Sequence, residues 1–312
     1  MIGIGIIALL IGNDFRTGRC TRRIGGLLAL LVQQAASVQI DPHVACLDNV
    51  LHLAGLNVSC FILPGIIPPE TLALLREECS YFLGYMDGTM DTKGVEVEGI
   101  NHRGKRYFIG NRYRLSPRMR EFTFSPLMAE VAQAALGPNV YLFNEQWVVK
   151  NAEQGMQFGW HQDSRYVMRS HPDAKHPPYL TCWVTLDDVS EINGTVHLLP
   201  HSRGGTKETI FSHELEPGSN DLIAYRGEDP GDPLIVPVGT IVGFSSYVFH
   251  RSGPNTTNRM RRIYLPQYSA APIGDDDVRS WAMAVPFVKD GKIIYHAADD
   301  TAEKYGPKPK KK

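Results

Sequence analysis

Short apolar segments separated by turn residues run through the chain from residue 140 onwards. Several of them alternate apolar and polar residues, which is typical of strands that bury one face. We expect strands over residues 140–150, 180–189, 195–199, 234–238, 239–248 and 261–268. Asp290-Gly291, inside the apolar stretch 287–296, predicts a β-hairpin, because this dipeptide suits a tight two-residue turn. Asn193-Gly194 carries the same signal and predicts another hairpin between the strands at 180–189 and 195–199.

Two segments before residue 140 have the periodicity of helices. The first begins at Pro68-Pro69-Glu70, and one face carries apolar residues at helical spacing, namely Leu72, Leu75, Cys79 and Phe82. The second has Ser125 as a suitable N-cap and Gly137-Pro138 as a stop signal. The whole pattern predicts a mainly β protein with flanking helices (α+β), built as a closed or sandwiched antiparallel sheet.

Composition limits the choice of function without selecting one. The chain has 312 residues, of which 43% are hydrophobic and 21% are charged, as in ordinary globular proteins. This length suits one large domain or two small ones. The formal net charge of −1 gives no electrostatic reason to expect binding to nucleic acid or to an anionic membrane.

Both ends of the chain differ from its centre. The apolar runs 1–12 and 24–32 are shorter than the roughly 18 residues that span a bilayer. We expect residues 1–54 to be a poorly ordered or accessory extension and the protein to be cytoplasmic, although Arg22-Arg23 followed by an apolar run leaves secretion as an alternative. Residues 299–312 end in a Pro-Lys-rich stretch and predict a disordered basic tail. The folded domain is therefore expected over residues 55–298.

The candidate chemistry centres on His161 and Asp163. On an extended segment, residues two apart point to the same side, so this imidazole and carboxylate can bind one metal ion. His250, at the end of a distant apolar run, can supply a second imidazole. Two histidines and one carboxylate are the ligand set of non-haem Fe(II) oxygenases, and zinc also accepts this set.

Two further residues lie at suitable distances from His250 along the chain. Arg261 follows it by eleven residues, on the next apolar strand, and a guanidinium there can bind a carboxylate through two N–H groups. Ser252 follows His250 by two residues and can donate its hydroxyl to the same carboxylate.

These residues, with the segment from Asn193 to Ser202 and with Asn255, resemble the phytanoyl-CoA dioxygenase family over roughly residues 55–270. The resemblance implies a double-stranded β-helix, which is a jelly roll of the cupin type. It implies Fe(II), 2-oxoglutarate as co-substrate and O₂, with ascorbate as a possible reductant. The implied catalytic metal ligands are His161, Asp163 and His250, and the implied ligands of the distal 2-oxoglutarate carboxylate are Arg261 and Ser252.

The resemblance implies three more residues near the co-substrate. Gln146 is expected on the inner face of the strand at 140–150, and Trp183 is expected against 2-oxoglutarate, although a tryptophan there also suits a core position. Lys105, Arg106 and Arg112 are all candidates to hold an anionic group here. A lysine before this strand approaches 2-oxoglutarate in the family, and Lys105 is chosen because its offset matches. A solvated basic hairpin is the alternative for this region. Lys150 ends the strand and faces either the site or the solvent.

The expected activity is hydroxylation of a C–H bond in a small organic substrate, with conversion of 2-oxoglutarate to succinate and CO₂. A non-catalytic jelly roll that binds a small ligand and a zinc hydrolase with the same three ligands are the alternatives. Presence of all three ligands and of Arg261 favours the oxygenase. No CoA phosphate site is evident, so phytanoyl-CoA is not carried over as the substrate, and nothing in the sequence indicates the oligomeric state.

Overall fold

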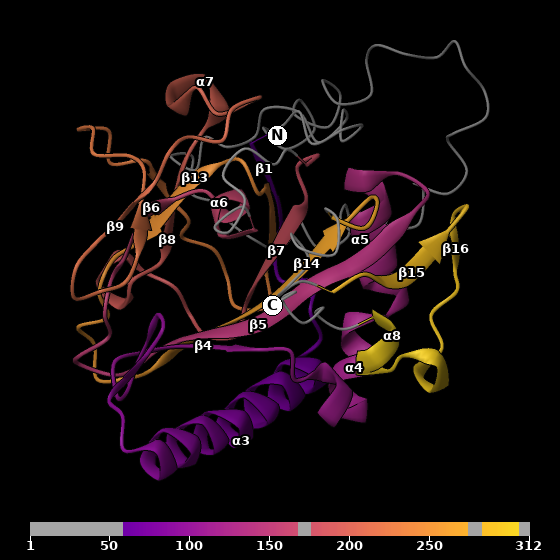
Figure 1. Cartoon of the computed structure of the whole chain (residues 1–312), viewed down its shortest axis with the longest axis horizontal. Coiled ribbons are helices and arrows are strands. Elements are labelled where there is room, and N and C mark those ends of the chain that lie inside the picture. Colours follow the sequence, from indigo (N-terminus) through magenta and orange to yellow (C-terminus); the bar gives the residue numbers. More distant parts are fainter. Residues whose placement is uncertain (1–58, 168–175, 274–282, 306–312) are drawn as a thin grey trace, which may run out of the picture. The chain divides into compact units, whose positions relative to one another are not determined.

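Two antiparallel sheets make up most of the computed structural model, which describes residues 59–167, 176–273 and 283–305 (Figure 1). The larger sheet has ten strands, in the order β1 (Cys60–Leu63), β12 (Ile241–Ser245), β7 (Leu180–Thr185), β14 (Arg261–Ser269), β5 (Val140–Lys150), β4 (Arg106–Gly110), β3 (Asn101–His102) and β2 (Val97–Glu98), with β15 (Val285–Lys289) paired to β5 and to β16 (Lys292–Ile293). The smaller sheet has the order β11 (Asp232–Pro233), β8 (Val196–Leu199), β13 (Phe249–Ser252) and β6 (Phe158–His161).

The chain alternates between these two sheets as it advances from β5 to β14. Strands β5, β7, β12 and β14 belong to the larger sheet, and β6, β8 and β13, which fall between them, belong to the smaller one. A short ribbon of β9 (Glu214–Leu215) and β10 (Leu222–Ile223) lies in the long connection after β8. This alternation is that of a jelly roll, so the predicted mainly β fold with flanking helices is confirmed.

Helices cover the outer side of the larger sheet. Helix α3 (Pro69–Lys93) ends at Gly94, whose φ of 64° suits glycine, and it buries the four apolar residues that the periodicity predicted. One of them, Phe82, places its ring 5.4 Å from that of Trp147 on β5. Helix α3 contacts β4 and β14, and α5 (Pro126–Leu136) contacts β7. Every residue of the central strand β7 is buried. The other α-helices of the described residues are α4 (Pro117–Thr123), α6 (Asp163–Val167), α7 (His201–Gly204) and α8 (Ala302–Tyr305).

Local signals fixed some turns correctly and one wrongly. Ser125 caps α5 by accepting a hydrogen bond from the N–H of Met128, and Asp290-Gly291 joins β15 to β16, both as predicted. The predicted hairpin at Asn193-Gly194 is wrong, because β7 and β8 lie in different sheets. A short 3₁₀ turn, Glu191–Asn193, precedes Gly194, and a Cβ on this glycine would lie 2.3 Å from the carbonyl oxygen of Gly253. Close packing against the loop after β13 therefore requires this glycine. No strand forms over 234–238 either.

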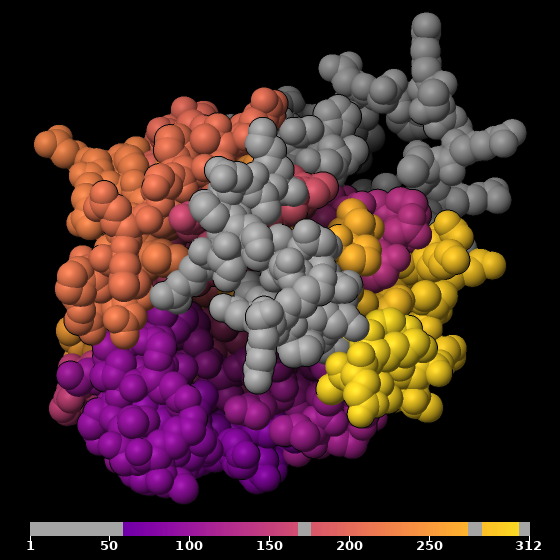
Figure 2. Space-filling model, viewed as in Figure 1, coloured from indigo at the N-terminus to yellow at the C-terminus, as the bar shows by residue number. Residues whose placement is uncertain are grey.

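The C-terminal segment is more ordered than the sequence indicated. Asp300 is buried and accepts hydrogen bonds from Tyr113 at 2.7 Å and from Arg114 at 2.6 Å. In Figure 2 this segment, in yellow, packs against the magenta surface that follows β4. The predicted tail of 299–312 is therefore corrected for residues 299–305, while 306–312 and the predicted extension of 1–54 lie outside the described residues. No helix within the described residues is long and apolar enough to cross a membrane.

Candidate active site

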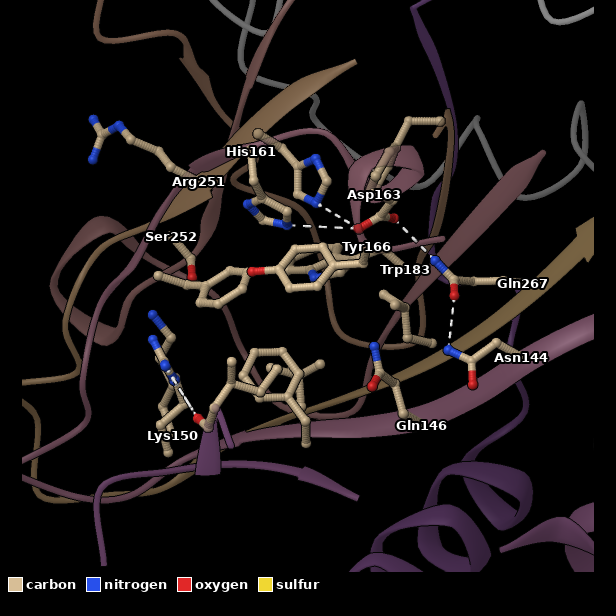
Figure 3. Close-up of a pocket in the computed structure, with 18 of the residues that line it drawn as sticks. Asn144, Gln146, Lys150, His161, Asp163, Tyr166, Trp183, Arg251, Ser252 and Gln267 are labelled. Atoms are coloured by element: carbon tan, nitrogen blue, oxygen red, sulfur yellow. Dashed lines mark hydrogen bonds and ion pairs between the residues drawn. The ribbon is translucent and has the colours of Figure 1, made fainter. Parts of the chain in front are cut away.

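His161, Asp163 and His250 come together at one end of the smaller sheet (Figure 3). His161 on β6 and His250 on β13 are direct cross-strand partners, and their ring centroids lie 4.0 Å apart. Asp163 begins α6 immediately after β6, and its Oδ1 lies 3.6 Å from Nε2 of His161 and 3.4 Å from Nε2 of His250. The three ligand atoms all lie within 4.8 Å of one another, so they can hold one metal ion.

Backbone carbonyls orient both imidazoles. Nδ1 of His161 lies 2.8 Å from the carbonyl oxygen of Gly159, and Nδ1 of His250 lies 3.1 Å from that of Val248. A carbonyl only accepts hydrogen bonds, so each Nδ1 carries the proton and each Nε2 keeps its lone pair for a metal. Burial, together with the neighbouring His250, lowers the pKa of His161 and favours this neutral form.

Asp163 is held in its ionised form. Burial tends to raise the pKa of its carboxyl, but His250 and His161 outweigh burial and hold the pKa well below its usual range. Two neutral imidazoles and one carboxylate are the protonation states in which these side chains bind a divalent metal.

A cavity of about 330 Å³ opens beside the three ligands, between the two sheets. Its apolar walls include Phe108, Phe158, Tyr179, Trp183, Phe244 and Leu265. Figure 3 shows Lys150 and Ser252 toward one end of the cavity and Asn144, Gln146 and Gln267 toward the other. A mainly apolar cavity with a few polar groups at defined places is typical of a small-molecule site.

Arg261 at the cationic end of the cavity is the strongest sign of an anionic ligand. Its side chain is 2% exposed, and one Nη donates to the carbonyl oxygen of Gly194 at 2.6 Å. Burial lowers the pKa of Arg261 to about 10, so the guanidinium keeps its charge at neutral pH. Within the described part of the chain, its Nε has no hydrogen-bond partner and no carboxylate forms an ion pair with it. A buried cation in this state fits the distal carboxylate of a dicarboxylic acid.

Lys150 lies beside Arg261 and does not face the solvent. It is fully buried on β5, directly opposite Arg261 on β14 and Arg106 on β4, and its Nζ donates to the carbonyl oxygen of Gly253. Burial, followed by repulsion from Arg261 and Arg106, lowers the pKa of Lys150 well below its usual value. Arg106 differs from the other two cations because it forms a buried ion pair with Asp221 at 2.7 Å.

Of the residues expected near the co-substrate, Gln146 on β5, Trp183 on β7 and Ser252 on β13 all line the cavity. Their contact with a co-substrate stays a prediction. Lys105 does not line the cavity: its side chain is exposed, in the turn between β3 and β4. The next residue, Arg106, is the first residue of β4 and lines the cavity. The choice of Lys105 is corrected accordingly.

Sequence reasoning missed Gln162, which separates the first two metal ligands. Its amide donates to the carbonyl oxygens of Thr209 at 2.8 Å and Tyr247 at 2.7 Å, and accepts from the N–H of Phe211 at 2.7 Å. The alternation that brings His161 and Asp163 to one side places Gln162 on the other, where it fastens two loops. This alternation was the signal that could have identified it.

Comparison with known proteins agrees with this geometry. Residues 61–263 match the family model described as phytanoyl-CoA dioxygenase (PhyH). A probable alpha-ketoglutarate-dependent hypophosphite dioxygenase of Stutzerimonas stutzeri is 31% identical over 212 residues, which are 65% of this chain and 71% of that protein. The L-proline trans-4-hydroxylase of Streptomyces griseoviridis is 29% identical over 162 residues, which are 46% of this chain and 60% of that protein.

Solved structures share the fold at lower identity. The non-heme monooxygenase ThoJ has a TM-score of 0.56 at 18% identity, covering 78% of this chain and 86% of its own. EvdO2 from Micromonospora carbonacea var. aurantiaca, solved with 2-oxoglutarate, has a TM-score of 0.53 at 21% identity, covering 70% of this chain and 89% of its own. These two similarities show that the fold is shared.

Proposed function

The chain belongs to the phytanoyl-CoA dioxygenase family, and from this premise we propose that it is an Fe(II)- and 2-oxoglutarate-dependent dioxygenase that hydroxylates a C–H bond of a small organic substrate. The observation that carries the proposal is a His-Asp-His site that shares one cavity with the buried Arg261, which has no carboxylate partner among the described residues. A zinc hydrolase would use the three ligands but would leave this arginine without a partner.

Each part of the site then has a separate task. His161 and His250 would hold Fe(II) through Nε2, and Asp163 would hold it through Oδ1. Arg261 and Ser252 bind the distal carboxylate of 2-oxoglutarate at the cationic end of the cavity. When bound, Fe(II) and 2-oxoglutarate supply the oxidation by O₂, in which one oxygen atom enters succinate, the other enters the substrate and CO₂ is released.

Aromatic side chains limit the access of water to this chemistry. Phe158 lies edge-on to the His161 ring at 4.4 Å, and Phe244 lies 4.9 Å from the His250 ring. Tyr166 also contacts His161, at 5.7 Å between ring centroids. Exclusion of water strengthens the attraction between Arg261 and a carboxylate, because the local dielectric constant falls.

The cavity also favours a particular charge on the substrate. Among its described wall residues, Asp163 is the one carboxylate, and it is a metal ligand in this proposal. No second carboxylate lies in these described walls, so nothing in them would neutralise a cationic substrate, whereas an anionic or neutral substrate meets no such cost. One relative carries the name of an oxygenase of hypophosphite, a small anion, which agrees with this preference. Stimulation of 2-oxoglutarate turnover by small acids, and not by quaternary amines, would support it.

A direct assay tests the reaction. The protein is purified anaerobically, supplied with Fe(II), ascorbate, 2-oxoglutarate and O₂, and succinate is measured. We expect succinate from the wild type, none from His161→Ala, and a rise of about a hundredfold or more in the 2-oxoglutarate KM of Arg261→Ala, because the substitution removes one partner of a buried charge pair.

Arg259→Ala is the matched control, since Arg259 is an exposed arginine two residues away that does not line the cavity. It should retain the wild-type KM. Hydrolysis that depends on zinc, without consumption of 2-oxoglutarate, would overturn the proposed oxygenase.

A further inference from the structure

The second oxygen of Asp163 is held by hydrogen bonds that the roles above do not use. Its Oδ2 accepts a hydrogen bond from Oγ1 of Thr181 at 2.8 Å and another from Nε2 of Gln267 at 2.9 Å. Both donors are buried, on strands β7 and β14 of the larger sheet. The metal ligands His161 and His250 belong to the smaller sheet, so Asp163 is fixed from the opposite side of the cavity.

These donors belong to a row of polar residues that crosses three neighbouring strands. Gln267 on β14 is the direct cross-strand partner of Thr181 on β7 and of Asn144 on β5. Its Oε1 accepts from Nδ2 of Asn144 at 2.9 Å, and its Nε2 also lies 2.9 Å from Oγ1 of Thr181. Figure 3 shows the chain of bonds from Asp163 through Gln267 to Asn144.

The row allows one orientation of the Gln267 amide. Asn144 donates to Oε1, so the NH₂ group must face Asp163 and Thr181, where both of its hydrogens find acceptors. With that amide in place, the Thr181 hydroxyl donates to Asp163. Every hydrogen-bonding group of Gln267 is thus used, and a fully connected buried network of this kind is rigid.

The consequence for Asp163 is that its two oxygens are not equivalent. Oδ1 faces both Nε2 atoms, at 3.6 and 3.4 Å, and is available to a metal. Oδ2 can turn toward a metal only by giving up both of its hydrogen bonds inside the protein. A carboxylate that bound through both oxygens would occupy one more position around the ion.

We propose that Thr181 and Gln267 are positioning residues, which hold Asp163 as a ligand through one oxygen and so keep coordination positions free for a 2-oxo acid. The proposal rests on the proposed function, because it assumes that His161, Asp163 and His250 bind the metal. Asn144 contributes by orienting Gln267, although it is one step further from the ligand.

The test uses Co(II) in place of Fe(II), since the Co(II) absorption spectrum reports the number and kind of ligands without turnover. Thr181→Val removes the hydroxyl at constant shape, Thr181→Ser keeps it, and Gln267→Leu removes the amide. For each variant we would measure the Co(II) spectrum, the 2-oxoglutarate Kd of the Co(II) protein by titration, and the thermal stability of the metal-free protein.

We expect Thr181→Val and Gln267→Leu to change the Co(II) spectrum and to weaken 2-oxoglutarate binding by about 10–100-fold. Thr181→Ser, which keeps the hydroxyl, should have the wild-type spectrum and Kd. Thr185→Val is the control, because Thr185 lies on the same strand and loses a buried hydroxyl bond to the carbonyl oxygen of Pro237 away from the metal ligands. It should lower stability and leave the spectrum and the Kd unchanged.

Three results would overturn the positioning role: wild-type spectra and Kd values in both Thr181→Val and Gln267→Leu, effects no larger than those of Thr185→Val, or failure of Thr181→Ser to restore binding. If Thr181→Val does not fold, Gln267→Leu and Asn144→Leu probe the same network from its other end. Failure of the wild-type Co(II) protein to bind 2-oxoglutarate would instead refute the proposed function, so the two failures are distinguishable.

Discussion

One row across the adjacent strands β4, β5 and β14 contains three basic residues, namely Arg106, Lys150 and Arg261. Their interaction partners differ. Arg106 has a carboxylate partner in Asp221, and Arg261 is proposed to bind a co-substrate carboxylate. Lys150 has a backbone carbonyl as its hydrogen-bond partner. A buried ammonium in this position is costly to the fold, because neighbouring cations repel it and a carbonyl offsets only part of the lost hydration.

Replacement of Lys150 by Met should therefore stabilise the metal-free protein at neutral pH, by about 1–4 kcal/mol, which is the range for buried ion pairs exchanged for apolar groups of similar volume. Because the folded-state pKa of Lys150 is lowered, the unfolded chain binds more protons between that pKa and about 10.4, so wild-type stability rises with pH in this window. Lys150→Met lacks this dependence, and its advantage should shrink as the pH rises. Urea unfolding between pH 7 and 10 measures both quantities.

The exposed Lys105 supplies the control, since Lys105→Met removes the same charge from a solvated turn. That variant should match the wild type within about 0.5 kcal/mol at every pH. A Lys150→Met protein that is less stable than the wild type at pH 7, or that has the wild-type slope against pH, would show that the buried lysine is compensated by a group other than the Gly253 carbonyl.

Among the elements, the passage from β6 into α6 determines the geometry of the site. Within three residues it places His161 and Asp163 on the cavity side and Gln162 on the opposite side. Gln162 then bonds the segment around Thr209 and Phe211, and also the turn at Tyr247 before β13. One buried amide thus connects the strand that carries the first histidine with the approach to the second.

Gln162→Leu should loosen this connection. It removes three hydrogen bonds of the buried Gln162 amide, one fully buried and two partly buried, and two carbonyls and one N–H lose this partner. We therefore expect a loss of about 2–4 kcal/mol in the free energy of unfolding and weaker Co(II) binding. Urea unfolding and Co(II) titration measure these effects. Gln154→Leu, at an exposed position before β6, is the matched control. Unchanged Co(II) affinity in Gln162→Leu would mean that the ligands are placed without this clamp.

At the scale of the whole molecule, the sequence predicted what depends on local pattern. The alternation of apolar residues located the long strand β5 at its observed bounds, and the two-residue spacing of His161 and Asp163 predicted that these two ligands converge. His250 was added from its place at the end of a distant apolar run and from the family resemblance. The hairpin predicted at Asn193-Gly194 does not form, because the strands before and after it, β7 and β8, pair in different sheets. The local sequence pattern does not encode this pairing. Lys105 was chosen over Arg106 because the sequence does not show at which residue the turn ends and β4 begins. A shift of one residue changes which side chain faces the cavity.

Long-range polar partners were beyond the reach of the sequence for a similar reason. Thr181, Gln267 and Asn144 are each ordinary strand residues, and their common row appears only when the register of β7, β14 and β5 is known. The same holds for Lys150. Its place at the end of an apolar strand also suits a solvated lysine, and its buried position appears only when strand pairing puts Arg261 and Arg106 on either side of it. Such residues are found from the pairing of strands and not from sequence motifs.

The metal site joins the two sheets, so occupancy should stabilise the described body as a unit. His161 and His250 come from the smaller sheet, and Asp163 is tied to the larger one. Binding at a metal concentration of one hundred times Kd should add about 2.7 kcal/mol, seen as a rise in Tm with added Co(II) at pH 7.5. The rise should vanish in His250→Ala, and a chelator should reverse it in the wild type.

Acid should abolish the same stabilisation, because protons compete with the metal for the two Nε2 atoms. Burial lowers the pKa of His161, so its neutral form persists below the ordinary range of histidine near 6.5, and the metal-dependent rise in Tm should survive to a pH below that value before it is lost. A Tm shift that persists in His250→Ala, or that is independent of pH, would place the bound ion elsewhere on the protein. A Tm rise that is lost both in His250→Ala and at acid pH would show that one ion, held by His161, Asp163 and His250, connects the two sheets.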